Sequence, residues 1–85
     1  MFNVYHYNHW SSGSAVVVAT SQVLAGGFKP EDEESAALAF VPVASFDTET
    51  EAVAEARRLA GQKAEEYRCT MPTVDGSPVL FALKF

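Results

Sequence analysis

The sequence predicts a single α+β domain spanning residues 1 to 85, with one amphipathic helix packed on one face of a small antiparallel sheet. Three observations predict it. Aromatic and β-branched residues fill short segments separated by turn residues in the first half of the chain, which is typical of strands. An apolar stripe at helical spacing follows, and the final residues alternate in polarity as a strand does. The predicted order is β-β-β-α-β, with four strands or five.

The first two strands form a hairpin. Residues 2 to 10 mix aromatic and β-branched side chains, SSGS at 11 to 14 supplies the turn, and residues 15 to 25 form the second strand. No charged residue precedes Lys29, so the hairpin lacks the charges that usually protect a sheet edge. Consecutive valines point to both faces of the second strand, so we expect a second covering layer. A dimer partner or a target protein is one way to supply it.

An acidic segment precedes the third strand. KPEDEES, residues 29 to 35, is interpreted as a solvated loop, and the alternative is a short helix over residues 30 to 40 with Pro30 in its first turn. ALAFVPVASF, residues 37 to 46, predicts the third strand. Because Pro42 cannot donate to a ladder, we expect an edge or a bulge at this strand.

The helix is the clearest element. Thr48 and Glu51 match an S/T-x-x-E capping box, so the helix is predicted to begin there and to run to about Tyr67. Its apolar stripe predicts the face that packs on the sheet. The predicted inner residues are Val53, Ala56, Leu59, Ala60, Ala64 and Tyr67, and the predicted outer residues are Glu51, Glu55, Arg58, Gln62 and Glu65.

A final strand closes the chain. Asp75 and Gly76 mark a turn, and PVLFALKF, residues 78 to 85, follows it. Alternation predicts one face that packs against the helix, made of Val79, Phe81, Leu83 and Phe85. An extra short strand around residues 69 to 73 would make the sheet five-stranded.

Charge and cysteine content narrow the function classes. The net charge is −5, and a negative field disfavours direct binding of nucleic acid or of an anionic membrane. Cys69 is the single cysteine, which fits a reducing, cytoplasmic location. The uninterrupted apolar runs, such as residues 15 to 19, are all too short for a membrane span or a signal sequence. We therefore expect a cytoplasmic protein whose partner has a basic surface.

The sequence offers little for catalysis or for metal binding. His6 and His9 lie three apart on a strand, so their side chains point to opposite faces and cannot share one ion. Ser11, Ser12 or Cys69 could be paired with a histidine only on paper, because no nucleophile motif surrounds them. No glycine-rich phosphate motif occurs either. We expect no enzymatic activity, no metal and no cofactor.

Two segments are candidate partner-binding sites. Tyr5, Tyr7 and Trp10 bring large aromatic area to the first strand, which is typical of interface hot spots. The alternative is that these rings wrap the core. The second segment is the acidic run, consisting of Glu31, Asp32, Glu33 and Glu34, which Asp47 and Glu49 would enlarge if the fold brought them together. It is either a solubilising loop or a patch that docks on a basic surface.

Three resemblances accompany these residues. The stretch SFDTETEAVAEARRLAGQKAEEY resembles the helix opening of many small bacterial and phage domains of unknown function. The element order is similar to that of HicB-type antitoxins, although VPVAS, residues 41 to 45, stands where those proteins carry a PGC segment. The short, acidic chain without enzymatic motifs is similar in general character to phage-encoded anti-CRISPR proteins. That resemblance implies a non-enzymatic inhibitor that binds a host CRISPR-Cas-type protein or ribonucleoprotein complex, and the HicB resemblance implies an antitoxin or a dimeric adaptor.

Overall fold

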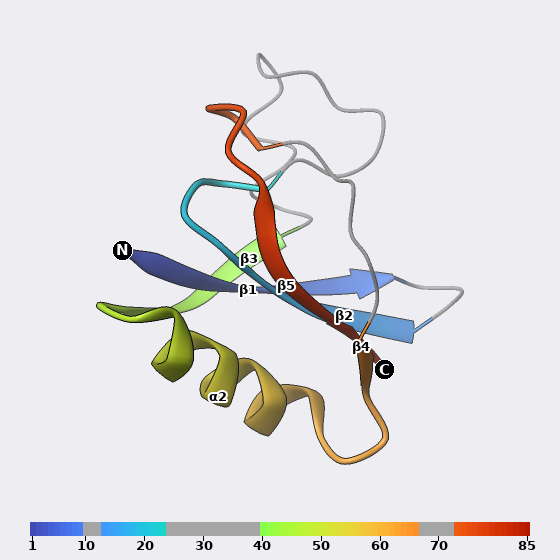
Figure 1. Cartoon of the computed structure of the whole chain (residues 1–85). Helices are drawn as coiled ribbons and strands as arrows, with labels where there is room; N and C mark the ends of the chain where they lie inside the picture. The colour runs from blue at the N-terminus through green and yellow to red at the C-terminus, as the bar shows by residue number, and fades with distance from the viewer. Residues whose placement is uncertain (10–12, 24–39, 67–72) are drawn as a thin grey trace.

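The protein folds as a five-stranded antiparallel sheet with helix α2 on one side (Figure 1). The structure is a computed structural model and describes residues 1–9, 13–23, 40–66 and 73–85. The elements follow in the order β-β-β-α-β-β. Their bounds are β1 Phe2–His9, β2 Gly13–Ala19, β3 Phe40–Phe46, α2 Glu49–Ala60, β4 Glu65–Glu66 and β5 Val79–Lys84. The α+β class predicted from the sequence is confirmed.

The sheet has the strand order β3-β1-β2-β5-β4, and all four pairings are antiparallel. β3 is therefore an edge strand. Its pairing with β1 also shifts register opposite Val4 and Tyr5, because Val4 pairs with Ala44 whereas Tyr5 pairs with Pro42. The expectation of an edge or a bulge at Pro42 is confirmed on both counts, since a proline fits where no ladder donor is needed.

The hairpin has different limits from those expected. β2 begins at Gly13, inside the segment that was predicted to be a turn, and it ends at Ala19. Beyond that end, Val23 makes only an isolated bridge to Thr73. The second strand predicted to extend to residue 25 is thus shorter. The alternatives for residues 30 to 39 lie outside the described residues, while Phe40 starts β3.

Two core clusters lie on opposite faces of the sheet. The helix-side core consists of Val4, Val16, Val18, Ala52, Ala56, Ala60 and Leu83. The far-side core consists of Tyr5, Val17, Ala19, Val23, Phe40 and Ala82. Val17 is fully buried within this one chain. The expected burial of β2 on both faces is confirmed, and the single chain itself supplies the second layer, so burying Val17 does not require a dimer partner or a target.

Helix α2 begins as predicted but ends early. Thr48 is its N-cap and accepts a hydrogen bond from the Glu51 amide at 3.3 Å. The Glu51 carboxylate accepts from the Thr48 hydroxyl at 2.9 Å, where a capping box would have it reach the backbone amide. At the other end Gly61 adopts φ +85°, a conformation that only glycine reaches without strain. The helix therefore stops at Ala60 rather than near Tyr67.

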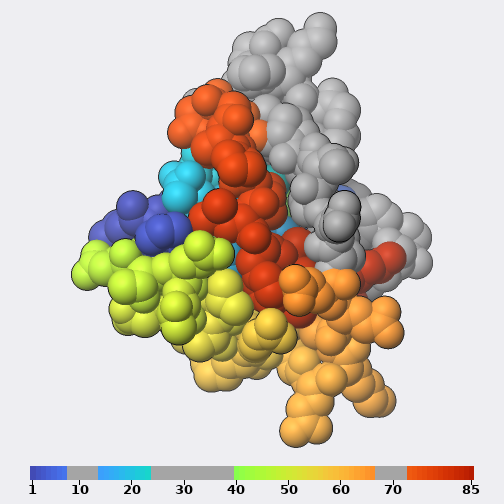
Figure 2. All heavy atoms as spheres, viewed as in Figure 1, coloured from blue at the N-terminus to red at the C-terminus, as the bar shows by residue number. Residues whose placement is uncertain are grey.

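The inner face of α2 is narrower than predicted. Ala52, Ala56 and Ala60 are buried at four-residue spacing, and their small side chains let the helix lie close to the sheet. Leu59, predicted to be inside, lies on the flank and is 37% exposed. Figure 2 shows the helix, in yellow-green and yellow, directly against red strand β5. Ala64 packs on the same core from beyond the helix, and Tyr67 lies outside the described residues.

The fifth strand exists, although its position differs from the prediction. β4 pairs Glu65 and Glu66 with the end of β5, where the sequence predicted helix. The extra strand was predicted at residues 69 to 73; of these, 69 to 72 lie outside the described residues, and Thr73 makes an isolated bridge to Val23. No helix in the described ranges is long and apolar enough to span a membrane.

The last strand does not keep one continuous face. Phe81 and Leu83 pack on the helix-side core as predicted. Val79 instead packs against the far-side core, because the register between β2 and β5 shifts at Val18 and Ala19. A one-residue shift moves a side chain to the opposite face of a sheet. Phe85, beyond β5, is 39% exposed.

Candidate protein-binding surface

The two tyrosines predicted to bind a partner are mainly core residues. Tyr5 is 5% exposed and belongs to the far-side core. Tyr7 is half-buried, and its ring stacks on Phe40 with a centroid distance of 4.6 Å and an interplanar angle of 17°. Tyr5 therefore offers almost no surface to a partner, as the alternative that these rings wrap the core expects, whereas Tyr7 keeps part of its surface exposed.

The environment of Tyr5 also affects its ionisation. Burial raises the pKa of the Tyr5 phenol above its ordinary value, because desolvation penalises the charged form, and a hydrogen bond with Asn3 offsets part of that effect. Asn3 in turn accepts a hydrogen bond from the Ser45 hydroxyl on the edge strand, at 2.7 Å. Tyr5 is thus held as a neutral core side chain.

The other predicted contact residues cannot be placed. Trp10 lies outside the described residues, and so does the whole acidic run, Glu31, Asp32, Glu33 and Glu34. The relation between that run and the start of the helix, which the sequence left open, is likewise not described.

The structure exposes an apolar strip on the edge strand instead. Val41 and Val43 are each 48% exposed, and Pro42 between them is exposed as well. Sequence reasoning did not single out these two valines. The sequence VPV could have indicated this exposure. A proline inside a β-branched run is typical of an edge strand, and the side chains of an edge strand have fewer neighbours to bury them. We call these three residues the VPV edge.

Acidic side chains follow the VPV edge where β3 leads into the helix. Asp47, Glu49 and Glu51 are all exposed, and we call them the acidic turn. Carboxylates in the first turn of a helix are stabilised by its dipole. Among the described residues Asp47 and Glu49 form no ion pair. Asp47 and Glu49 thus follow the exposed apolar side chains of β3 along the chain.

The cations of the described residues gather at the opposite end of the helix. These cations are Arg57, Arg58, Lys63 and Lys84. Arg57 lies over the Phe81 ring at 4.9 Å and 4.0 Å from a Glu66 oxygen, and Arg58 pairs with Glu55. At this end of the described molecule the cations therefore lie among carboxylates, including those of Glu65 and Glu66 in β4.

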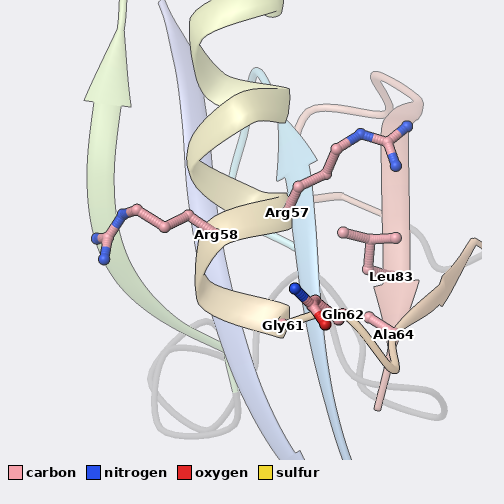
Figure 3. Close-up of a pocket in the computed structure, with 6 residues that line it drawn as sticks. All are labelled: Arg57, Arg58, Gly61, Gln62, Ala64 and Leu83. Carbon is pink, nitrogen blue, oxygen red and sulfur yellow. The ribbon is translucent and has the colours of Figure 1, made fainter.

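An open hollow of about 400 Å³ lies at the C-terminal end of α2, lined by Arg57, Arg58, Gly61, Gln62, Ala64 and Leu83. Figure 3 shows the two arginine side chains leaving the helix in opposite directions. Their guanidinium groups do not converge, each already has an acidic neighbour, and the carbonyl end of a helix disfavours anions. The hollow is therefore poorly suited to a phosphate or a carboxylate.

A polar turn precedes β5. One Asp75 carboxylate oxygen accepts from the Ser77 hydroxyl at 2.6 Å, from the Ser77 amide at 2.9 Å and from the Thr73 hydroxyl at 3.2 Å. These bonds, above all those from Ser77, lower the pKa of Asp75 to about 2. Gly76 adopts φ +82° within the turn. The polar groups of Thr73, Asp75 and Ser77 hydrogen-bond to one another, and these bonds stabilise the turn.

Of the histidine and cysteine side chains, the structure describes that of His6. The His6 ring lies 5.9 Å from the Phe85 ring, between centroids, and Cys69 lies outside the described residues. Within the described ranges no three His, Cys, Asp or Glu side chains are grouped to hold a metal ion.

No family model, curated protein or solved structure matches this chain.

Proposed function

We propose that this chain is a non-enzymatic phage or mobile-element protein that inhibits a host CRISPR-Cas-type defence complex by binding it stoichiometrically in the bacterial cytoplasm. The observation that carries the proposal is that the exposed apolar side chains of the VPV edge and the exposed carboxylates of the acidic turn follow one another on β3 and the turn after it, and that Asp47 and Glu49 form no ion pair among the described residues. Apolar contact area with a charged margin is the usual composition of a protein-binding surface.

The chemistry of the partner follows from charge. The acidic turn and the net charge of −5 favour a basic surface, and complementary charge mainly raises the association rate. CRISPR effector complexes hold their nucleic acids in positively charged channels. An acidic protein that occupies such a surface would compete with phosphates, which gives the proposed inhibition a physical basis.

A plating assay tests the proposed function. Phage that is targeted by the spacer of a CRISPR-Cas strain would be plated on cells that express this chain or an empty vector, across strains that carry different CRISPR-Cas types. We expect the plating efficiency to rise by orders of magnitude for at least one type. No rise with any type, at confirmed expression, would refute the inhibitor proposal.

A matched pair of variants tests whether the acidic turn makes the contact. The double change Asp47→Asn and Glu49→Gln removes two charges there, whereas Glu65→Gln and Glu66→Gln removes two charges from β4. Both leave the same net charge. We expect only the first variant to weaken inhibition, and to weaken it more at low salt. Equal loss in both variants would show that overall charge, not this surface, matters.

A second candidate is a HicB-like antitoxin or a dimeric adaptor. The β-β-β-α-β order within the observed β-β-β-α-β-β order favours it. A dimeric adaptor was expected to cover an exposed face of the sheet at β2. Val17, on that face, is already fully buried in the single chain, so this reason for a dimer is lost. Sedimentation that gives a concentration-independent mass of 9.2 kDa would remove the dimeric adaptor from consideration.

A further inference from the structure

The hydrogen-bond directions in the sheet show which way the backbone of Pro42 faces. Ser14 and Phe85 exchange two backbone hydrogen bonds, at 2.7 and 2.8 Å, so the backbone of Ser14 faces β5. Backbone direction alternates along a strand, and Val17 therefore faces β1. Tyr5 pairs with Val17, so the backbone groups of Tyr5 point to β2 and away from β3.

The position opposite Tyr5 on β3 is Pro42. Because Tyr5 directs its backbone groups to β2, Pro42 occupies a non-hydrogen-bonded pair, and its own backbone faces the free edge. The residue type supports the same direction independently. Proline has no N–H, so it fits only at a position where the ladder with β1 needs no donor. Phe40, two residues before Pro42, also directs its backbone to the outer edge of β3. Its carbonyl already accepts a hydrogen bond there from the Gln22 side-chain amide, at 3.3 Å.

Among the residues that the structure describes, no strand pairs with the outer edge of β3, and this edge lacks the charges that usually protect one. β3 has no charged residue from Phe40 to Phe46, and lysines are the side chains that most often keep exposed edges from pairing. Val41 and Val43 are exposed there. An uncharged, β-branched edge is a template for another strand, and Pro42 together with the register shift beside it interrupts that template.

We infer that Pro42 keeps this chain from pairing through β3 with a second copy of itself. A second copy is the occupant that fits the edge, because two β3 strands related by a twofold axis run antiparallel and present the same uncharged surface to each other. That arrangement places the two acidic turns at opposite ends of the paired strands, so their charges do not meet. The inference does not depend on the proposed function.

Sedimentation equilibrium over a wide concentration range tests the inference. The variant Pro42→Thr restores the missing donor, and Pro78→Thr makes the same change at an exposed proline outside the strands. We expect the natural chain and P78T to stay at 9.2 kDa, and P42T to move toward twice that mass as concentration rises. Adding V41K to P42T should restore the monomer, because it brings positive charges to the paired edge.

Two outcomes would overturn the inference. One is a folded P42T chain that remains a monomer over the whole range, with circular dichroism showing the fold. The other is a natural chain that already dimerises and that V41K alone converts to a monomer, since the edge would then be open despite Pro42. The variant Pro42→Ala, which restores the donor with a smaller side chain, should give the same association and replaces P42T if that chain does not fold.

Discussion

Tyr7 and Phe40 stack face to face across the ladder between β1 and β3, with their ring centroids 4.6 Å apart. Phe40 is fully buried, whereas Val41, the next residue of the same strand, is 48% exposed. The contact ties the edge strand to the hairpin. It also places an aromatic residue expected to bind a partner against the far-side core.

Replacing Phe40 with alanine should therefore be costly. We expect F40A to lower the free energy of unfolding by about 3 to 5 kcal/mol, because it removes a buried ring and leaves a cavity. Urea denaturation would measure it. The control V41A, at an exposed position of the same strand, should change stability by less than about 0.5 kcal/mol. Similar losses in both variants would contradict the burial described for Phe40.

The closeness of the helix to the sheet is tested at Ala56. Because Ala56 is fully buried in the helix-side core, A56L should force the helix away from the strands and cost about 1 to 3 kcal/mol. The control A54L makes the same change on the exposed side of the same helix and should be nearly neutral. Thermal and urea unfolding of the pair would show whether the difference exists.

The N-cap is tested at Thr48. T48A removes the oxygen that accepts from the Glu51 amide and should destabilise the fold by about 1 kcal/mol. T50A lies two residues further on, at an exposed helical position, and should be neutral or slightly stabilising, since alanine is the better helix former. A loss in T50A as large as that in T48A would argue against a specific cap.

Asp75 predicts a pH dependence of stability. Its pKa is about 2 in the folded chain against 3.8 as the ordinary value. A group whose pKa falls on folding stabilises the protein above its unfolded pKa. The contribution is therefore complete above about pH 4 and is lost as the pH falls toward 2. The stability difference between the natural chain and D75N should shrink across that window.

A direct titration separates this effect from that of the other carboxylates. NMR detection of the Asp75 side-chain carbon should give a pKa near 2 in the natural chain, and S77A should move it upward, because Ser77 supplies the largest lowering contribution. An Asp75 that titrates near 3.8 in the natural chain would show that the turn does not form these hydrogen bonds.

Local patterns predicted the elements well where one residue dictates the backbone. The cap at Thr48, the proline at an edge and the turn at Asp75 and Gly76 all depend on short-range geometry, and all are present. The helix end was misplaced because the predicted helix, which ran to about Tyr67, continued through Gly61. The backbone instead uses the positive φ of this glycine to leave the helix.

The candidate site was predicted less well, because exposure is not a local property. Tyr5 and Val41 are both strand residues with large apolar side chains, yet one is buried and the other exposed. Two things separate them: β1 lies inside the sheet whereas β3 lies at its edge, and Tyr5 faces the far-side core, as Phe40 does, whereas Val41 does not. No pattern along the chain states which strand pairs with which.

The amino-acid sequence alone determined the α+β class, the start of the helix and the acidic, non-basic character of the chain, since each depends on composition or on residues a few positions apart. Only the tertiary structure decided that the single chain buries Val17, that Val79 crosses to the far side and that Pro42 faces the free edge. These three facts depend on register and strand order, which are set by packing between segments distant in the sequence.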